Sequence, residues 1–157
     1  MTTSAHILPA AAILLALGGC SEPSRTQVLA SRVTASLDPA QPCNSQASIE
    51  SVPNGTRIRL PEASLFVVGR ADLSACGHYA LASVTEAMLD PRIMQVVVEP
   101  EADANAGSSL SLRRADTVKA ALSDVGFTSF QPPVVVQPAT APAQGVLGIV
   151  LAVAASG

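Results

Sequence analysis

The sequence predicts an α/β fold in which helices pack on one sheet, because two kinds of segment alternate along the chain. Short β-branched or alternating segments are typical of strands. Longer segments with apolar residues every three or four positions are typical of amphipathic helices. Alternation of the two favours a two-layer sandwich. The expected order is strand, helix, strand, helix, strand, strand, or β-α-β-α-β-β.

The first strand and the first helix have clear signals at their ends. Residues 53–55 (Pro-Asn-Gly) indicate a turn, and residues 56–60 then alternate polar and apolar side chains, as a half-buried strand does. Asp72 or Ser74 can cap the helix that follows. That helix ends before Pro91, because a proline disfavours helical backbone angles in the residue before it.

A second strand and helix follow the same scheme. Residues 93–99 (IMQVVVE) form a β-branched run, which predicts a buried strand. Ser108 or Ser109 can cap a helix that runs through Val125. Gly126 then suits the left-handed conformation that ends many helices.

Two further strands are expected near the end of the chain. Residues 134–136 predict a short strand, and residues 145–154 (GVLGIVLAVA) predict a central strand buried on both faces. The alternative for the last segment is a membrane-associated tail. A helical span needs about twenty apolar residues, roughly twice what this segment offers, so the strand is favoured.

The composition excludes several classes of function. Nine basic and twelve acidic residues give a formal net charge of −3, so the chain lacks the basic field of a nucleic-acid-binding protein. Two histidines and three cysteines are too few and too scattered for a structural zinc site. The sequence contains no Ser-His-Asp set, phosphate-binding glycine loop or metal cluster. We therefore expect neither an enzyme nor a cofactor.

The amino terminus has the pattern of an export signal. Residues 7–17 are apolar and uncharged, with the length of a signal-peptide core. Residues 17–20 (Leu-Gly-Gly-Cys) resemble a bacterial lipobox, which implies a signal peptide over residues 1–19 and acylation of Cys20. Ser21 at the next position implies sorting to the outer membrane, with the domain facing the periplasm. The alternative is an ordinary secretory leader with an incidental cysteine.

Residues 20–51 predict a flexible linker after the acylated cysteine, because they are polar and weakly patterned. A short helix over residues 27–37 is the alternative within this stretch. The folded domain is then expected over residues 52–157. Cys43 and Cys76 form an even pair in an oxidising compartment, and two states are open for them: one disulfide that ties the linker to the domain, or two free thiols.

Residues 57–127 resemble the OmpA-like carboxy-terminal domain, the peptidoglycan-associated module of Gram-negative envelopes. The best match is Leu110-Ser111-Leu112-Arg113-Arg114-Ala115, which resembles the Leu-Ser-x-x-Arg-Ala signature at the head of the family's second helix. A lipobox ahead of such a domain is similar to the peptidoglycan-associated lipoproteins. The resemblance implies an OmpA-like two-layer sandwich with a mixed sheet, two helices packed on it, and peptidoglycan as the partner.

The resemblance also implies a ligand site for the diaminopimelate of the peptidoglycan stem peptide. Asp103 corresponds to the acid that accepts the ligand's ammonium, and Arg114 to the arginine that receives a carboxylate. A zwitterion needs one fixed charge of each sign, and arginine offers a bidentate fork. The alternatives are a solvated loop acid for Asp103 and a surface ion pair for Arg114.

The loop before the second helix departs from the family. Pro100, Glu101 and Ala102 replace its Gly-His-Thr, the loop is shorter, and the basic motif ahead of the last strand is missing. Two functions therefore stay open. One is an outer-membrane lipoprotein that binds peptidoglycan non-covalently. The other is an adaptor subunit of an envelope or secretion assembly that keeps the fold, has lost wall binding and contacts other envelope proteins.

Overall fold

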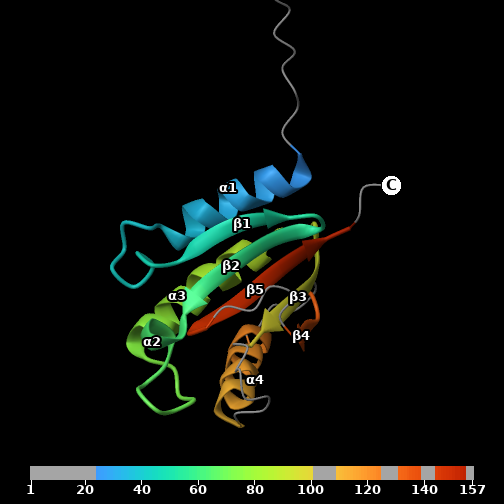
Figure 1. The fold of residues 1–157 in the computed structure, drawn as a ribbon. Coiled ribbons are helices and arrows are strands. Elements are labelled where there is room, and N and C mark those ends of the chain that lie inside the picture. Colours follow the sequence, from blue (N-terminus) through green and yellow to red (C-terminus); the bar gives the residue numbers. More distant parts are fainter. Residues whose placement is uncertain (1–23, 101–108, 125–130, 139–143, 155–157) are drawn as a thin grey trace, which may run out of the picture.

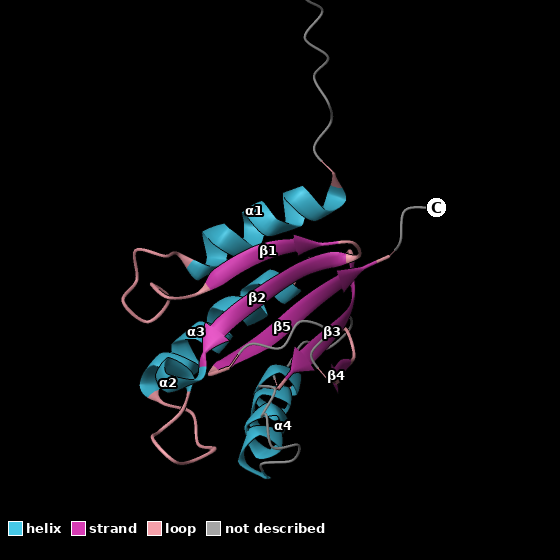
Figure 2. Ribbon diagram, in the orientation of Figure 1, coloured by secondary structure: helices cyan, strands magenta, loops and turns pink. Residues whose placement is uncertain are grey.

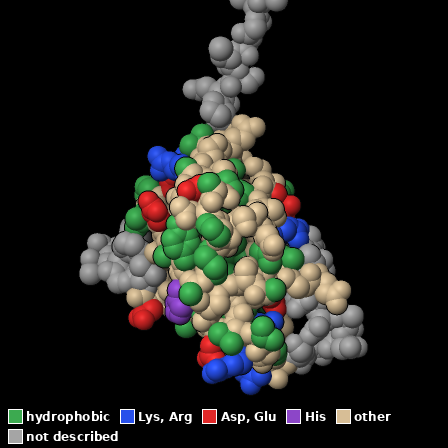
Figure 3. Space-filling view, turned by 90° about the vertical axis from the view of Figure 1, so that its left-hand side faces the viewer, with side chains coloured by type: hydrophobic (Ala, Val, Ile, Leu, Met, Phe, Trp, Pro, Cys, Tyr) green, Lys and Arg blue, Asp and Glu red, His purple; other side chains and the backbone are tan. Residues whose placement is uncertain are grey.

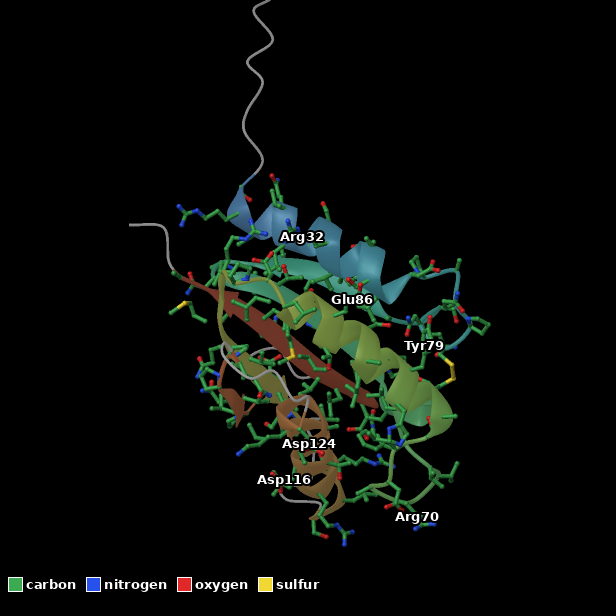
Figure 4. All side chains as sticks on the ribbon, turned by 180° about the vertical axis from the view of Figure 1, so that it is seen from behind. Arg32, Arg70, Tyr79, Glu86, Asp116 and Asp124 are labelled. Atoms are coloured by element: carbon green, nitrogen blue, oxygen red, sulfur yellow. A yellow bond between two sulfur atoms is a disulfide. The ribbon has the colours of Figure 1, made fainter. Side chains whose placement is uncertain are left out.

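The computed structural model describes residues 24–100, 109–124, 131–138 and 144–154, which form a five-stranded sheet with helices on one face (Figure 1). The strands are β1 (Ser48–Val52), β2 (Gly55–Pro61), β3 (Ile93–Glu99), β4 (Val134–Val136) and β5 (Val146–Val153). The helices are α1 (Arg25–Leu37), α2 (Glu62–Leu65), α3 (Ala75–Met88) and α4 (Ser109–Ser123). Figure 2 shows the strands in front of the helices, and the opposite view in Figure 4 shows α1, α3 and α4 in front of the sheet.

The sheet is mixed, with strand order β1-β2-β5-β3-β4. β3 and β4 are parallel, whereas the other neighbouring strands are antiparallel. The predicted α/β sandwich with a mixed sheet is therefore confirmed. β5 lies in the middle, since Ile149 pairs with Ile58 of β2 on one side and with Val98 of β3 on the other. The last apolar segment is thus a central strand, and among the described residues no helix is long and apolar enough to cross a membrane.

Alternate strand residues form the core, as the pleat of a sheet requires. In β2, Ile58 and Leu60 are fully buried, while Arg57 and Arg59 lie on the face away from the helices. The helices contribute buried apolar residues at helical spacing. These are Leu29, Val33 and Leu37 of α1, Ala80, Leu81, Val84, Ala87 and Met88 of α3, and Ala115, Val118 and Leu122 of α4.

The prediction of a flexible linker up to residue 51 is wrong, because α1 and β1 lie in this stretch. Leu29, Val33 and Leu37 are each at most 2% exposed, so α1 is part of the core. Ser24 begins the helix with a reciprocal capping box to Gln27. β1 then pairs with β2 along its whole length. The domain therefore includes these segments, and the boundary near residue 52 falls inside it.

Two links fasten the α1 segment to α3. Cys43 is joined to Cys76 by a disulfide, with 4.9 Å between the Cα atoms (Figure 4). Arg32 donates to the buried carboxylate of Asp90 just after α3, at 3.1 Å. Arg92 donates to the same carboxylate, and its hydrogen bonds lower the pKa of Asp90 to about 2. The amino-terminal segment is thus held near both ends of α3.

The start of α3 is fixed by Ser74 and Gly77. The hydroxyl of Ser74 accepts from the backbone N–H of Gly77 at 2.9 Å, so Ser74 and not Asp72 is the N-cap. Gly77 lies against the end of α2, where a Cβ would be 2.1 Å from the backbone oxygen of Leu65. The absence of a side chain at Gly77 allows α2 and α3 to pack this closely. Helix α4 ends at Ser123 in the described part of the chain, and Gly126 lies outside it.

Candidate functional site

Five elements meet at one end of the sheet, the lower end in Figure 1. β2 ends there at Pro61, whose register partner is Val146 at the start of β5. β3 ends there at Glu99, opposite Gly148. α2 and α4 begin at the same end, where Figure 3 shows basic and acidic side chains lying together. This end combines a helix start with both signs of charge.

Arg114 of α4 is held at this end by three segments of the chain. Its Nη1 donates to a carboxylate oxygen of Glu62, the first residue of α2. Its Nε donates to the backbone carbonyl of Arg70 at 3.0 Å. Its guanidinium carbon lies 5.0 Å from the centre of the Phe66 ring, within the range of a cation–π contact. The Arg114 side chain is 15% exposed, so it is fixed in position and still reaches the surface.

Glu62 is the buried acid among the groups around Arg114, with a side chain 3% exposed. It follows Pro61 at the end of β2, and its backbone N–H donates to the carbonyl of Gly145 at 2.9 Å. A carboxylate loses its hydration at such a position, and the loss is offset only by a well-aligned cation. Arg114 supplies that cation, from 52 residues further along the chain.

Some of the site residues predicted from the sequence lie in the described part of the chain, and others lie outside it. Arg114 lies at the end of the sheet just described, and its ion pair is with a buried acid, whereas the sequence alternative was an acid on the surface. Asp103 and Cys20 lie outside the described residues. Of the other signature residues, Arg113 is exposed and Ser111 is 6% exposed.

A second charged cluster lies on the helix-free face of the sheet. Arg57 grips the carboxylate of Glu99 through Nε at 2.9 Å and Nη2 at 3.1 Å, passing over β5. Arg57 and Arg59 both also donate to Glu50. The pKa of Arg57 is raised, chiefly by its hydrogen bonds to Glu99, and the pKa of Glu50 is lowered, chiefly by Arg57. Two arginines and two glutamates balance one another, which is typical of a structural network.

Gly148 of β5 lies beneath this network. A Cβ at Gly148 would be 2.8 Å from a carboxylate oxygen of Glu99. The glycine therefore leaves room for the Arg57–Glu99 ion pair above β5. The described residues contain no group of three His, Cys, Asp or Glu side chains that could hold a metal.

Neither a protein-family model nor a curated protein sequence matches the chain. Solved structures do. The cell wall anchor of the T6SS from Pseudomonas aeruginosa superposes with a TM-score of 0.60 at 17% identity, over 80% of this chain and 97% of that one. A putative MotB-like protein from Desulfovibrio vulgaris gives 0.56 at 15% identity, over 81% and 90%. The periplasmic domain of Helicobacter pylori MotB gives 0.53 at 16%, over 69% and 80%. The fold is that of the OmpA-like domains. At these identities the likeness establishes the fold.

Within the OmpA-like fold, sequence reasoning found Arg114 and missed the groups around it. Arg114 stood out because it falls in the Leu-Ser-x-x-Arg-Ala signature. Glu62 had one weak signal, a carboxylate between Leu60-Pro61 and the apolar run of residues 65–68. The Arg57–Glu99 pair had a comparable one, an arginine in an alternating strand and an acid that ends a β-branched run. Neither signal predicts which residue forms the ion pair, because the partners in both pairs are far apart in the sequence.

Proposed function

We propose that the chain is an outer-membrane lipoprotein whose periplasmic OmpA-like domain binds peptidoglycan non-covalently. The observation that carries the proposal is the fold shared with a bacterial cell wall anchor over 97% of that protein's chain. Arg114 adds to it, because it presents a partly exposed guanidinium from the second turn of α4, in the signature of the OmpA-like domains. The role is binding, with no catalytic step.

The proposed ligand is the diaminopimelate of the stem peptide. Arg114 faces its carboxyl group, and Asp103 accepts its ammonium. Asp103 belongs to the segment that connects β3 to α4, and both of these elements reach the Arg114 end of the sheet. In this proposal Arg114 supplies the positive charge and the hydrogen-bond donors, and Asp103 supplies the negative charge that the ligand's ammonium needs.

The anchor is proposed at the opposite end of the molecule. Residues 1–19 are a signal peptide in this account, and Cys20 is acylated. The disulfide between Cys43 and Cys76 suits an oxidising compartment such as the periplasm. Thr56 at the start of β2 donates to the backbone oxygen of Thr26 at 3.5 Å, so α1 begins at the upper end of the sheet. Figure 4 shows Arg32 of α1 at the upper end and Arg70 at the lower end.

In a lipoprotein of this form, the size of the domain sets the distance between the membrane and the wall-binding end. Only residues 21–23 separate Cys20 from the N-cap Ser24, a reach of at most about 14 Å for an extended chain. β5 has eight residues, and at about 3.4 Å per residue it spans roughly 27 Å toward the Arg114 end. The domain itself, and not a long tether, then separates the membrane from the ligand.

Co-sedimentation with insoluble peptidoglycan sacculi tests the proposal. The protein is the mature chain with Cys20→Ser, so that no lipid contributes. We expect the wild-type domain to sediment with sacculi, and Asp103→Ala and the double variant Glu62→Gln/Arg114→Met to stay in solution. The double variant removes both partners of the buried pair, so it tests Arg114 without leaving a lone buried carboxylate. Glu50→Gln, on the other face, is the matched control that should still sediment.

A second function, an adaptor subunit of an envelope or secretion assembly, is favoured by one observation. The nitrogens Nε and Nη1 of Arg114 are already engaged by Arg70 and Glu62 within the protein. Arg114 can therefore stabilise the fold through these hydrogen bonds even in a protein that binds no peptidoglycan. A well-folded wild-type domain that ignores sacculi would favour the adaptor and move the search to protein partners.

A further inference from the structure

The protein itself uses part of the hydrogen-bonding capacity of Arg114. A guanidinium has two edges that can grip a carboxylate in the bidentate mode, Nε with Nη2 and Nη1 with Nη2. Nε of Arg114 donates to the carbonyl of Arg70 at 3.0 Å, and Nη1 donates to Glu62. A ligand carboxylate that binds the Nε–Nη2 edge in the bidentate mode has to displace the Arg70 carbonyl. One that binds the Nη1–Nη2 edge has to share Nη1 with Glu62.

Glu62 also cancels the charge that would attract a ligand anion. The side chains of Glu62 and Arg114 are 3% and 15% exposed, so little water screens them. A low local dielectric strengthens the attraction within the pair and equally strengthens the repulsion between Glu62 and a second carboxylate. An uncharged carbonyl oxygen avoids that repulsion, because it accepts one N–H and adds no net charge.

We propose that Glu62 is a positioning residue that sets the preference of the Arg114 site toward an uncharged carbonyl acceptor. The inference rests on the proposed function and names the form of its ligand. The preferred stem peptide carries the carboxamide of diaminopimelate at the position that faces Arg114, and the free carboxylate binds less well. Phe66 and the Arg70 carbonyl orient the guanidinium, while Glu62 fixes its charge balance.

The test compares two soluble muropeptides that differ only in this group, one with the free diaminopimelate carboxylate and one with its amide. Isothermal titration measures the dissociation constant of each for the mature chain with Cys20→Ser. We expect the wild type to bind the amide about tenfold more tightly, since like charges close together cost at least that factor. Glu62→Gln should reverse the preference, because it removes the negative charge that balances Arg114. Glu50→Gln, which also removes a carboxylate bonded to arginine, should leave the ratio unchanged.

The ratio of the two dissociation constants separates positioning from mere stability, because loss of folded protein lowers both affinities alike. Glu62→Asp keeps the charge and should keep the preference for the amide, which covers the case in which Glu62→Gln does not fold. The inference is overturned if the wild type prefers the free carboxylate, or if the ratio is the same in wild type and Glu62→Gln. Failure of the wild type to bind either muropeptide or sacculi would instead remove the proposed function, and the inference with it.

Discussion

The ion pair between Glu62 and Arg114 should behave as a coupled unit in the folded state. Breaking a buried pair by removing one partner costs about 3–5 kcal/mol, because a lone charge stays behind. Arg114→Met leaves the Glu62 carboxylate, whose side chain is 3% exposed, so we expect a loss of about 4 kcal/mol in the free energy of unfolding. Glu62→Gln leaves a guanidinium that is 15% exposed and still bonded to the Arg70 carbonyl, so a loss of about 2 kcal/mol is expected.

The double variant Glu62→Gln/Arg114→Met removes both charges and should cost about 2 kcal/mol, far less than the two single losses together. The assay is urea unfolding at pH 7 followed by circular dichroism, with equal m-values across the cycle. The pair between Glu50 and Arg59, with side chains 44% and 24% exposed, is the matched control and should show coupling below about 1 kcal/mol. Additive losses at Glu62 and Arg114 would refute the reasoning.

Three further features of the fold give predictions of their own. The pKa of Asp90 is lowered to about 2 from 3.8 by the Arg92 hydrogen bonds, so its stabilisation is present above about pH 4 and lost as the pH falls toward 2. Asp90→Asn should therefore cost about 2 kcal/mol at pH 7 and flatten the acid limb of a pH–stability profile measured by urea unfolding. Reduction of the Cys43–Cys76 disulfide opens a loop with a sequence separation of 33 and should lower stability by about 4 kcal/mol; an unchanged melting temperature in reductant would contradict this. Gly77→Ala places a Cβ 2.1 Å from a backbone oxygen of α2 and should cost about 3 kcal/mol in the same urea assay, whereas no loss would mean that α2 and α3 separate freely.

Local patterns predicted most of the sheet and the helices. The β-branched run at residues 93–99 predicted a buried strand, and the apolar run at residues 145–154 favoured a central strand over a membrane-associated tail. The helical spacing likewise predicted the buried face of α3. In α4 it predicted Ala115, Val118 and Leu122 correctly, whereas Leu112, which has the same spacing, is 52% exposed. In these segments propensity, periodicity and end signals agree, so tertiary context had little left to decide.

The amino-terminal part of the domain was harder to predict. α1 buries only Leu29, Val33 and Leu37 in its length, and the rest of the helix is polar or small. A stripe of three residues fits a docked helix and a weakly structured linker equally well. What decides is the contact with α3, made through Asp90 and the disulfide. Those contacts join residues that no local pattern connects.

In the candidate site, too, local sequence predicted one residue and the tertiary fold determines its partner. Arg114 could be predicted because it belongs to a short sequence signature. Its partner Glu62 could not, because the pair depends on where β2 ends relative to α4. The ligand preference proposed here follows from that partner, so the structure adds chemistry to a residue that the sequence had only located.

The measurement that tests the central claim most directly is co-sedimentation of the mature chain, as Cys20→Ser, with two preparations of sacculi. One preparation is intact, and the other has had its stem peptides removed by an amidase. The account predicts that the domain sediments with intact sacculi and stays in solution with the stripped glycan. A folded domain that stays in solution with intact sacculi, or that binds both preparations equally, would contradict recognition of the stem peptide.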